Sequence, residues 1–551
     1  MSITSINQAN QALINWLSEP TNFSENCEQV QRIETHISCV FLTGQYAYKL
    51  KKRVNFGFLD FTQLAQRQRF CEMEVELNRR TAPQLYLGVV PVYQHPQQPD
   101  QISWTQQPGL VVADYLVKMN QFDPEKVLSR YLLHTALSNS QVSQLALAIA
   151  RLHQQAESIP AGDFLGSPAC VLEPMTDNFP SLMALLDCPH LKTTQADFDC
   201  LALRNRLNQL ELWTRNQHTL LAPMIEQRQQ QGHVRACHGD LHLDNITLID
   251  DQPVLFDGIE FNDQFRWIDT LSDLAFLLID LDYRQKPALA LSILNRYLQQ
   301  TGDYAGLVLL RFYQTYRALV RAKITGLRYQ QLDPESAEAR YVLNTMVAYI
   351  DLAEHYAYLH QANPTLFIMQ GISGSGKSYY AEQIHQQLGA LVISSDRERK
   401  RLYGIQNTTR VSDAEKSVLY SPHMNQATHQ ALYQACQSAL QSGLSVVADA
   451  TFLQAKHRER FIEMAESAQR PYLIISLEPD EDLAEQRIAE REQLNQDPSD
   501  ANAAVMRHQL HQYEAPLASE KSLRIKMGDA LPLLKDYLDQ PITSLVKEIS
   551  G

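Results

Sequence analysis

The stretch Leu366-Phe-Ile-Met-Gln-Gly371-Ile-Ser-Gly-Ser-Gly376-Lys377-Ser378 decides the fold of the C-terminal part of this chain. Its first four residues are all apolar and are followed at once by glycines, which is typical of a buried parallel strand that runs into a loop. The eight residues from Gly371 match the pattern G-x-x-x-x-G-K-[ST]. Helical periodicity begins at about Tyr379. Because the pattern stands between a strand and a helix, the sequence predicts a phosphate-binding loop here.

The composition of this loop suits the binding of a nucleoside triphosphate. Glycines let the backbone curl so that successive N–H groups face the β-phosphate, the lysine brings positive charge to the β and γ oxygens, and the last hydroxyl reaches magnesium. Lys377 is thereby both a binding and a catalytic candidate, and Ser378 is a metal-ligand candidate. The residues predicted to hold the nucleotide are Gly371, Ser373, Gly374, Ser375, Gly376, Lys377, Ser378 and Tyr379.

Downstream of the loop, short apolar runs alternate with longer stretches of helical spacing. The runs lie at 391–393, 444–448, 472–477 and 523–527. This alternation predicts a parallel sheet covered by helices, an α/β domain. Asp396 directly follows the first of these runs, where a strand-end carboxylate beside the phosphates can accept the proton of a substrate hydroxyl. We expect Arg399 and Lys400, on the succeeding helix, to hold an anionic substrate.

Three further residues of this region are candidates for the transfer step. Asp449 ends the run at 444–448, where it is either a magnesium ligand or a turn residue at a strand end. Arg487 and Arg491 are four apart and so share one face of a predicted helix. They either close over the triphosphate as a lid that stabilises the transferring group, or are solvated and paired with Glu485 and Glu490.

Four motifs of this part of the chain together resemble the small P-loop kinases of the gluconate kinase and zeta-toxin type. They are the phosphate-binding loop, SSDRERKRLYG at 394–404, VVADATF at 446–452 followed by Arg458, and RIAERE at 487–492. The resemblance covers about residues 365–540. It implies an ATP-dependent phosphotransferase in which Arg458 contacts the substrate.

A second motif, in the first part of the chain, carries phosphotransfer chemistry of its own. His238-Gly-Asp240-Leu-His242-Leu-Asp-Asn245 has the form H-x-D-x-x-x-x-N, and a strand-like run at 254–256 ends in Asp257. Phosphoryl transfer needs a carboxylate near the attacking hydroxyl, for which Asp240 is the candidate. It also needs oxygen ligands for the magnesium that bridges the phosphates, for which Asn245 and Asp257 are the candidates.

A lysine that pairs with the α- and β-phosphates is expected upstream, on a strand of a small sheet. Lys49 is the favoured residue, and Lys51, two residues on, points to the same strand face and keeps the choice open. Such a lysine requires a carboxylate from a neighbouring helix. The helical stretch at 67–80 offers three, of which we expect Glu74 to be the partner; the others are Glu72 and Glu76.

With these residues the first part of the chain resembles the aminoglycoside phosphotransferase family, whose relatives include choline and homoserine kinases and which shares the protein-kinase-like fold. HGDLHLDN matches the family's catalytic loop, and the resemblance covers about residues 30–330. It implies that Asp240 is the base, that Asn245 and Asp257 bind metal, and that Asp273 braces the catalytic loop from behind.

The chain departs from the kinase pattern in two places. The metal motif reads Asp257-Gly-Ile, where protein kinases have Asp-Phe-Gly, and no G-x-G-x-x-G loop precedes Lys49. In its place stands Thr35-His-Ile-Ser38, which either offers hydroxyl and N–H groups to phosphate or forms a polar hairpin.

The order of these features predicts two domains. Strand-like runs at 40–42, 47–50, 87–92 and 110–113 come first, and helical periodicity dominates from about residue 123. A helical pattern at 336–359 ends before Pro364, where the residue preceding proline leaves the helical region. We therefore predict an α+β, two-lobed, protein-kinase-like domain at 1–361 and a P-loop NTPase domain at 362–551. The first would comprise a small lobe at about 30–118, a helical lobe at about 119–335 and a connecting helix at 336–361.

Composition narrows the class of protein. The 551 residues include 48 Lys plus Arg against 62 Asp plus Glu, a formal net charge of -14, which argues against a general nucleic-acid binder. The sequence shows neither a basic, apolar leader nor an apolar stretch of about 18 residues, so we expect a cytoplasmic protein without membrane spans. Its cysteines form no CxxC pair, which predicts reduced thiols and no structural zinc.

Taken together, the motifs predict two kinase modules that use ATP and Mg²⁺. Each would transfer a γ-phosphoryl group to a hydroxyl of a small-molecule or nucleotide-sugar-like acceptor. Two other functions stay open: a P-loop module that senses nucleotide and regulates the first kinase, and a polynucleotide-type kinase. Neither the acceptors nor the oligomeric state follow from the sequence.

Overall fold

The computed structural model describes residues 3–55, 57, 59–187, 199–358, 363–405, 409, 411–494 and 502–534. Two compact units make up the protein: Met1–Arg284 with Tyr316–Ile350, and Gln285–Thr315 with Asp351–Gly551. The segment Gln285–Thr315, which the sequence places within the first domain, thus packs in the second unit. No helix among the described residues combines the length and the apolar character that crossing a bilayer requires.

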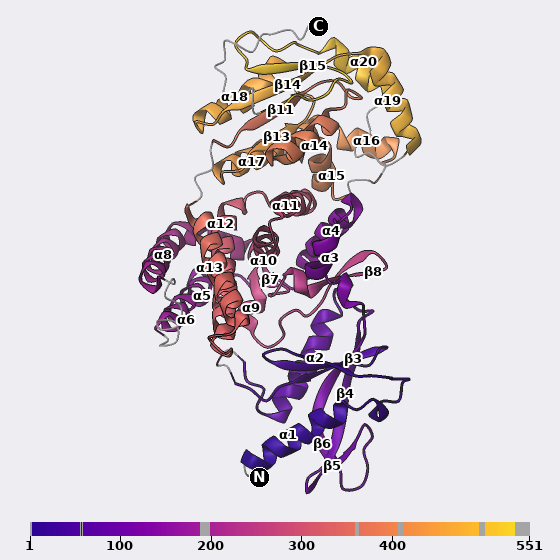
Figure 1. Ribbon diagram of the computed structural model, residues 1–551. Helices are drawn as coiled ribbons and strands as arrows, with labels where there is room; N and C mark the ends of the chain where they lie inside the picture. The colour runs from indigo at the N-terminus through magenta and orange to yellow at the C-terminus, as the bar shows by residue number, and fades with distance from the viewer. Residues whose placement is uncertain are drawn as a thin grey trace. The chain divides into compact units, whose positions relative to one another are not determined.

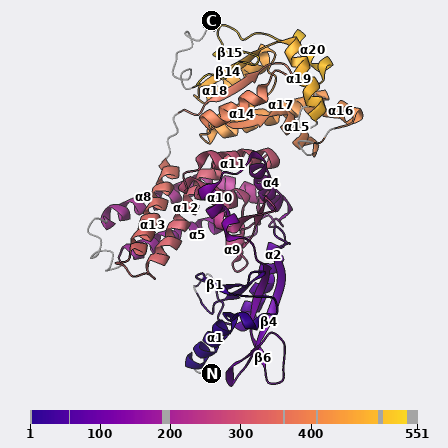
Figure 2. The same ribbon diagram turned by 45° about the vertical axis from the view of Figure 1, so that its right-hand side comes forward.

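The first unit begins with a curled antiparallel sheet in the order β1-β2-β3-β6-β4-β5. A helix, α2 (Leu64–Asn78), packs against β4 and β6 of this sheet, and both are drawn in indigo to purple (Figures 1 and 2). The strands are β1 (Gln31–Glu34), β2 (Ser38–Leu42), β3 (Tyr46–Lys51), β4 (Tyr86–His95), β5 (Gln98–Ser103) and β6 (Val111–Asn120). The apolar runs predicted as strands at 40–42, 47–50 and 87–92 lie within β2, β3 and β4. Alternate residues of β3 are buried with α1 (Ile3–Leu17) or with α2, so the sheet is covered on both faces.

The helical lobe of this unit surrounds two short antiparallel strand pairs, and the catalytic loop lies between the first strands of the two pairs. β7 (Val234–Ala236) pairs with β10 (Trp267–Asp269), and β8 (Ile246–Ile249) pairs with β9 (Gln252–Leu255). The buried helix α10 (Thr270–Tyr283) follows β10. The surrounding helices are α3 (Leu128–His134), α4 (Asn139–Gln155), α5 (Pro168–Thr176), α6 (Asn178–Leu186) and α8 (Cys200–Gln230), with α12 (Leu307–Tyr329) from Tyr316 onward and α13 (Ala337–Tyr358) as far as Ile350. α13 lies within the helix predicted at 336–361, whose residues 359–361 are outside the described part.

The second unit is built on a five-stranded parallel sheet in the order β12-β13-β11-β14-β15. Each strand matches a predicted apolar run: β11 (Leu366–Gln370), β12 (Leu391–Ser394), β13 (Val446–Asp449), β14 (Tyr472–Glu478) and β15 (Ser522–Lys526). Figure 1 shows it in orange to yellow with its helices, which are α14 (Lys377–Leu388), α15 (Ser395–Tyr403), α16 (Asp413–Leu419), α17 (Pro422–Gln441), α18 (Ala455–Ser467), α19 (Glu481–Leu494) and α20 (Ala503–His511). This is the predicted parallel sheet covered by helices, and the kinase-like fold of the first unit is confirmed as well.

A helix from the middle of the chain, α11 (Pro287–Thr301), completes the second unit. The Val392 N–H donates to Asn295 Oδ1 at 3.0 Å, and Gln299 Nε2 donates to the Val392 carbonyl oxygen at 3.0 Å. β12 stands at the edge of the sheet, so one side of its backbone has no neighbouring strand. Two buried amide side chains of α11 therefore satisfy backbone groups that a sixth strand would otherwise pair.

Candidate active sites

The predicted residues of the first unit gather at the open end of the β8–β9 hairpin, where β8 begins and β9 ends. Asn245 Nδ2 donates to Asp240 at both Oδ2 (3.0 Å) and the backbone oxygen (2.9 Å). The Phe256 N–H donates to the Asn245 carbonyl oxygen at 3.0 Å, which holds the end of β9 beside the loop. Asp257 follows there in the left-handed region, with φ 60°. Asp240, Asn245 and Asp257 thus lie together, as the motif predicts.

Lys49 and Lys51 of β3 share one carboxylate. Glu74, wholly buried on α2, accepts from Lys49 Nζ at 2.8 Å and from Lys51 Nζ at 2.6 Å. Lys49 also pairs with Asp257, whereas Lys51 pairs with Glu260. The partner of each lysine separates their roles: Lys49 faces the candidate metal ligand, and Lys51, 1% exposed, is enclosed between two glutamates.

The charges of this cluster stabilise one another. Burial alone would lower the pKa of Lys49, but Asp257 and then Glu74 raise it well above its usual value. Burial alone would raise the pKa of Glu74, but Lys49 and Lys51 lower it to about 2. Burial also raises the pKa of Glu260, and Lys51 opposes this shift. Both lysines and Glu74 are therefore charged at neutral pH.

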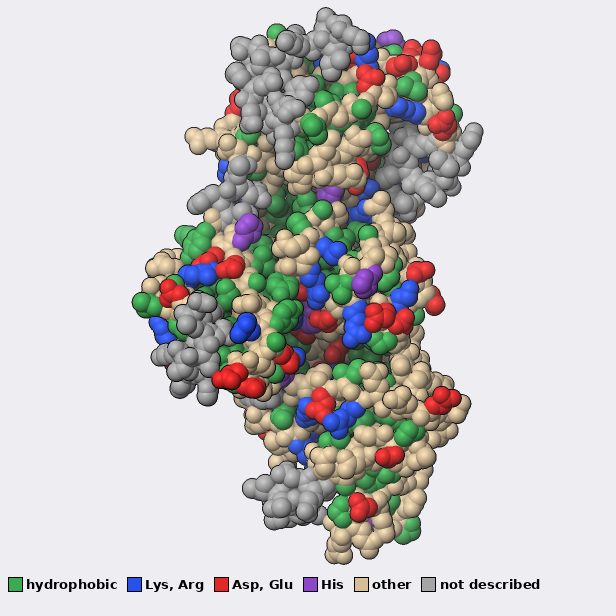
Figure 3. All heavy atoms as spheres, in the orientation of Figure 1, with side chains coloured by type: hydrophobic (Ala, Val, Ile, Leu, Met, Phe, Trp, Pro, Cys, Tyr) green, Lys and Arg blue, Asp and Glu red, His purple; other side chains and the backbone are tan. Residues whose placement is uncertain are grey.

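Asp240 is ionised in the same way. Burial alone would raise its pKa, but His242 and then Arg321 hold it well below its ordinary value. His242 Nε2 lies 3.2 Å from Asp240 Oδ2, and burial, which lowers the pKa of His242, is outweighed by the Asp240 charge. The Asp240 side chain is 37% exposed, so a hydroxyl can reach it. Figure 3 shows acidic and basic side chains around the recess where the helical lobe meets the sheet lobe.

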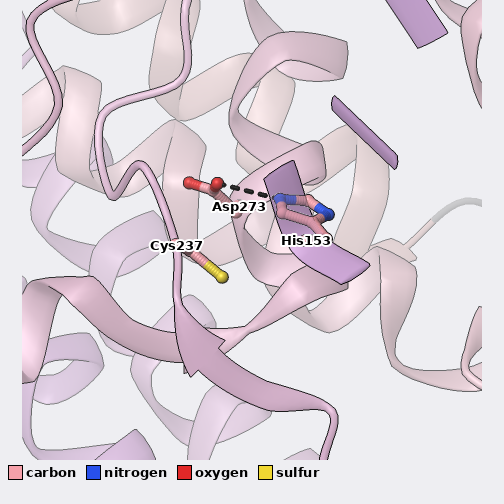
Figure 4. A group of neighbouring side chains, drawn as sticks. All are labelled: His153, Cys237 and Asp273. Carbon is pink, nitrogen blue, oxygen red and sulfur yellow. Dashed lines mark hydrogen bonds and ion pairs between the residues drawn. The ribbon is translucent and has the colours of Figure 1, made fainter. Parts of the chain in front are cut away.

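Asp273 of α10 holds the catalytic loop from behind. Its Oδ1 accepts from the Gly239 N–H at 2.8 Å, and its Oδ2 accepts from the His238 N–H and from His153 at 3.0 Å. Figure 4 shows His153 and Cys237 beside it, and these three side chains have a spacing that could hold a metal ion. The Asp273 oxygens already accept hydrogen bonds from the loop, and Cys237 Sγ donates to the Ile268 carbonyl at 3.4 Å. The group therefore braces the loop that carries Asp240.

Thr35-His-Ile-Ser38, which replaces a glycine-rich loop, is a tight polar turn between β1 and β2. The Thr35 N–H and hydroxyl both donate to the Ser38 carbonyl oxygen, and the Ser38 N–H donates to Thr35 Oγ1 at 3.0 Å. These bonds occupy the hydroxyl of Thr35 within the turn. Of the two alternatives for this segment, the described contacts favour the polar hairpin.

The phosphate-binding loop of the second unit lies between β11 and α14, as predicted. Gly374 and Gly376 have φ of 83° and 92°, which L side chains rarely adopt. A Cβ on Gly374 would lie 2.6 Å from the carbonyl oxygen of Ala484, and Ser373 N donates to Gln509 at 2.7 Å. Lys377 Nζ donates to the Ile372 carbonyl oxygen at 2.8 Å. The loop is thus curled over its own lysine and held by α19 and α20.

Ser378 and Asp449 meet at the first turn of α14. Ser378 Oγ donates to Asp449 Oδ2 at 2.9 Å, so the two candidate metal ligands are adjacent. Burial raises the pKa of Asp449, while Lys377 and Ser378 oppose the shift and Asp396 adds to it. Asp396 lies in the first turn of α15, directly after β12. Lys377, Ser378, Asp449 and Asp396 are therefore grouped at the carboxyl ends of the strands.

The predicted arginines and Lys400 differ in where they lie. Arg487 Nη1 donates to the Ser375 carbonyl oxygen at 3.1 Å, so it reaches the phosphate-binding loop, whereas the side chain of Arg491 lies outside the described residues. Arg399 donates to the Leu419 carbonyl oxygen at 3.1 Å and to Asn425, and Lys400 donates to the Thr409 carbonyl oxygen at 2.9 Å. The side chain of Tyr379, which was also predicted to hold the nucleotide, is 65% exposed.

Arg458, the third predicted substrate residue, is also bonded within the fold. It is wholly buried and forms a two-pronged ion pair with Glu520, each N–O distance being 2.9 Å. Its Nη1 donates to the backbone oxygens of Phe452 and Glu514. These bonds make it a tie between α18 and the loop before β15.

Sequence reasoning missed three residues of the first site: Glu260, His153 and Arg321. Glu260 stands only three positions after Asp257, and a motif search that continued past Asp257-Gly-Ile would have reached it. His153 and Arg321 lie 87 residues before and 81 residues after Asp240 by their numbers, on helices with ordinary amphipathic patterns. No local signal in the sequence marks them.

Comparison with known proteins identifies two domains in this chain. Residues 58–310 match the model of the phosphotransferase enzyme family, and residues 366–516 match an AAA domain model. An uncharacterized protein of Mycobacterium tuberculosis strain H37Rv is 31% identical over 419 residues, which cover 76% of this chain and 78% of the relative. The chain belongs to the phosphotransferase enzyme family, fused to a P-loop kinase domain. An uncharacterized Mycobacterium bovis protein matches to the same extent.

Solved structures resemble each domain separately. A gluconokinase from Sinorhizobium meliloti 1021 covers 32% of this chain and 90% of its own, at 21% identity and a TM-score of 0.22. An ADP-bound aminoglycoside phosphotransferase covers 62% of this chain and 98% of its own, at 16% identity and a TM-score of 0.34.

Proposed function

We propose that both domains are ATP-dependent kinases, each of which transfers the γ-phosphoryl group to a hydroxyl of a small-molecule acceptor. The observation that carries this proposal is the meeting of Asp240, Asn245 and Asp257 with Lys49 in the phosphotransferase domain. We place the protein in the cytoplasm, where ATP is abundant and would support this activity.

In the phosphotransferase domain, Asp240 would orient the acceptor hydroxyl and take its proton. An aspartate with a lowered pKa is fully ionised at neutral pH, so it serves first as a hydrogen-bond acceptor for the hydroxyl. Lys49 would bind the α- and β-phosphates, with Glu74 fixing its position. Asn245 donates through its amide nitrogen, which leaves the amide oxygen as the atom that suits a metal.

In the P-loop kinase domain, Lys377 and the loop N–H groups would hold the triphosphate. Arg487, already bonded to the Ser375 carbonyl oxygen, is placed to contact the transferring group, and Asp396 would accept the acceptor proton. Arg399 and Lys400 would border the acceptor, and Arg491 stays a candidate for the lid. Arg458 is not included, because its donors are used within the fold.

The oxygen donors of both sites fit Mg²⁺, which prefers hard oxygen ligands. They are Asn245 and Asp257 in the first domain, and Ser378 and Asp449, 2.9 Å apart, in the second. Bound magnesium would neutralise phosphate charge.

The test uses the full-length protein, γ-labelled ATP and an extract of small metabolites. Asp240→Asn and Lys377→Ala should each lower formation of a different labelled product, by about 10²- to 10⁴-fold. Matched controls are Asp251→Asn, in the exposed turn between β8 and β9, and Lys456→Ala, exposed on α18; both should leave the products unchanged. Loss of one and the same product in both variants would instead indicate a regulatory P-loop domain. Unchanged products in both variants would refute the proposal.

A further inference from the structure

A half-buried arginine approaches the proposed base from the helical lobe. Arg321, on α12, is close enough to Asp240 to help hold the pKa of that carboxyl low. Its guanidinium lies 5.6 Å from the centre of the Tyr349 ring, and Tyr349 in turn stacks on Tyr283 with centroids 4.2 Å apart. Among the described residues, its buried Nε has no hydrogen-bond partner. A buried donor without a partner is costly unless a ligand satisfies it.

The carboxylates around Arg321 are engaged elsewhere. Asp280 accepts from the Leu243 N–H at 3.0 Å and from Arg284 at 3.3 Å. Asp244 lies 3.7 Å from His242 and 3.9 Å from Arg284. Asp240 itself is bound to Asn245 and His242. Arg321 therefore keeps a positive charge next to the base that these acids do not bind directly.

The neighbouring arginine on the same helix face shows what a purely structural role looks like. Arg317, four residues earlier, donates to the Ser272 carbonyl oxygen at 3.0 Å and to the Gly239 carbonyl oxygen at 3.3 Å. It thus ties α12 to α10 and to the catalytic loop. In the described part of the chain, no hydrogen bond from the Arg321 side chain reaches the backbone in this way; its guanidinium lies beside the Tyr349 ring and hydrogen-bonds to the Tyr349 side chain.

We propose that Arg321 binds an anionic group, a phosphate or a carboxylate, on the acceptor of the phosphotransferase domain. The inference rests on the proposed function, in which Asp240 receives the acceptor hydroxyl. Asn245 bonds to Asp240, and Asp257, which follows the strand end held at Asn245, pairs with Lys49 of the sheet lobe; these residues form the proposed nucleotide side. Arg321 and the Tyr283–Tyr349 pair come from α12, α10 and α13, and the anion of an acceptor bound at Asp240 would meet them there. An acceptor with a positive charge instead would be repelled by Arg321.

The first experiment determines the sign of the acceptor's charge and does not require that the acceptor be identified. A small-metabolite extract is divided into fractions retained on an anion exchanger, retained on a cation exchanger, and unretained. Each fraction is incubated with labelled ATP and the full-length protein carrying Lys377→Ala, which leaves only the phosphotransferase domain to act. A product that is lost when Asp240→Asn is added to Lys377→Ala is the Asp240-dependent product. We expect the Asp240-dependent acceptor in the anion-exchange fraction. Phosphatase treatment of that fraction before the assay separates the sources: loss of the acceptor indicates a phosphate, and survival indicates a carboxylate.

Substitutions then test Arg321 itself on that fraction. Arg321→Met should raise the apparent KM for the acceptor about ten- to hundred-fold and leave kcat and the thermal shift induced by ADP nearly unchanged. Arg321→Lys, which keeps the charge, should recover part of the affinity. The control is Arg328→Met on the same helix, where the side chain is 54% exposed and pairs with Glu338; it should have no effect.

Three results would overturn the inference while leaving the proposed function standing. The first is an Asp240-dependent acceptor in the cation-exchange or unretained fraction. The second is a loss of kcat of about ten- to hundred-fold in Arg321→Met with no change in KM. The third is an effect of Arg328→Met as large as that of Arg321→Met. Absence of any Asp240-dependent product in every fraction would instead refute the proposed function of this domain, and the inference with it.

Discussion

Lys49 and Lys377, the two lysines proposed to bind phosphate, are held in contrasting ways. Lys49 pairs with Asp257, 208 residues away in the chain, and with Glu74, which comes from a helix on another part of the lobe. Lys377 donates to a carbonyl oxygen only five residues before it, in its own loop. The lysine of the first site thus belongs to a long-range balance of buried charges, whereas the lysine of the second bonds to the backbone of its own loop.

This contrast means that the sites should break in different ways. Removing a charge should damage the first site, because its neighbours are then left buried without compensation. Adding a methyl group should damage the second, because Gly374 leaves no room for one. The predictions below test this contrast.

The largest effect is expected at Glu74. Glu74→Gln keeps the shape of the side chain but leaves Lys49 and Lys51 without the carboxylate they share, so the free energy of unfolding should fall by about 3–5 kcal/mol. Urea unfolding of the full-length protein measures this. Glu72→Gln is the control, because Glu72 is exposed on the same helix and bonds to Gln68. A fall of less than about 1 kcal/mol in Glu74→Gln would contradict the view that buried charge holds this site together.

The same carboxylate predicts a pH dependence. Its pKa drops from 4.5 to about 2 on folding, because Lys49 and Lys51 outweigh the effect of burial. A group whose pKa is lowered in the folded state stabilises the protein above its unfolded pKa, and this contribution is lost as the pH falls. The difference in unfolding free energy between wild type and Glu74→Gln should therefore shrink by up to about 3 kcal/mol between pH 5 and pH 2. If this difference in unfolding free energy did not change with pH, the stabilisation by Glu74 would come from packing and not from its charge.

These charges also show why one site could be predicted more completely than the other. Gly371 to Ser378 bring most of the second site in a single stretch, and Asp449 and Asp396 follow from the rule that parallel strands end at one edge of the sheet. In the first site the HGDLHLDN motif revealed Asp240 and Asn245. Its electrostatics, however, depend on Glu260, His153 and Arg321, whose positions come from tertiary packing and not from local spacing. The same limit applies to Arg458: no sequence pattern indicates that it is buried against Glu520.

A smaller effect is expected from a methyl group in the second site. Gly374→Ala and Gly404→Ala place an alanine at nearly the same φ, 83° and 84°. A Cβ at Gly404 meets open space, whereas one at Gly374 would lie 2.6 Å from the Ala484 carbonyl oxygen. Gly404→Ala should cost about 1–2 kcal/mol of unfolding free energy, the strain of a left-handed residue. Gly374→Ala should cost more than about 2 kcal/mol, because α19 or the loop must move as well.

The nucleotide gives the second readout of this pair. Since α19 also carries Arg487, its displacement should abolish the rise in melting temperature that ATP or ADP produces in the P-loop kinase domain. Gly404→Ala should keep that rise. The two alanines should therefore differ in binding even where their stabilities overlap, and equal binding would show that the loop tolerates a wider shape than its contacts indicate.

The smallest expected effect tests whether the second site is as local as its motif. Asp396 follows β12 by two residues, and the backbone of β12 is held at Val392 by Asn295 and Gln299 of α11, about 100 positions earlier in the chain. Either residue changed to alanine should lower the unfolding free energy by about 1 kcal/mol, against no change for the exposed Gln387→Ala. Amide hydrogen exchange separates the two bonds. Asn295→Ala removes the acceptor of the Val392 N–H and should speed its exchange, whereas Gln299→Ala removes only the donor to the carbonyl and should leave that amide protected. Equal exchange in both variants would mean that α11 supports the strand by packing alone, and the second site would then be as local as its motif.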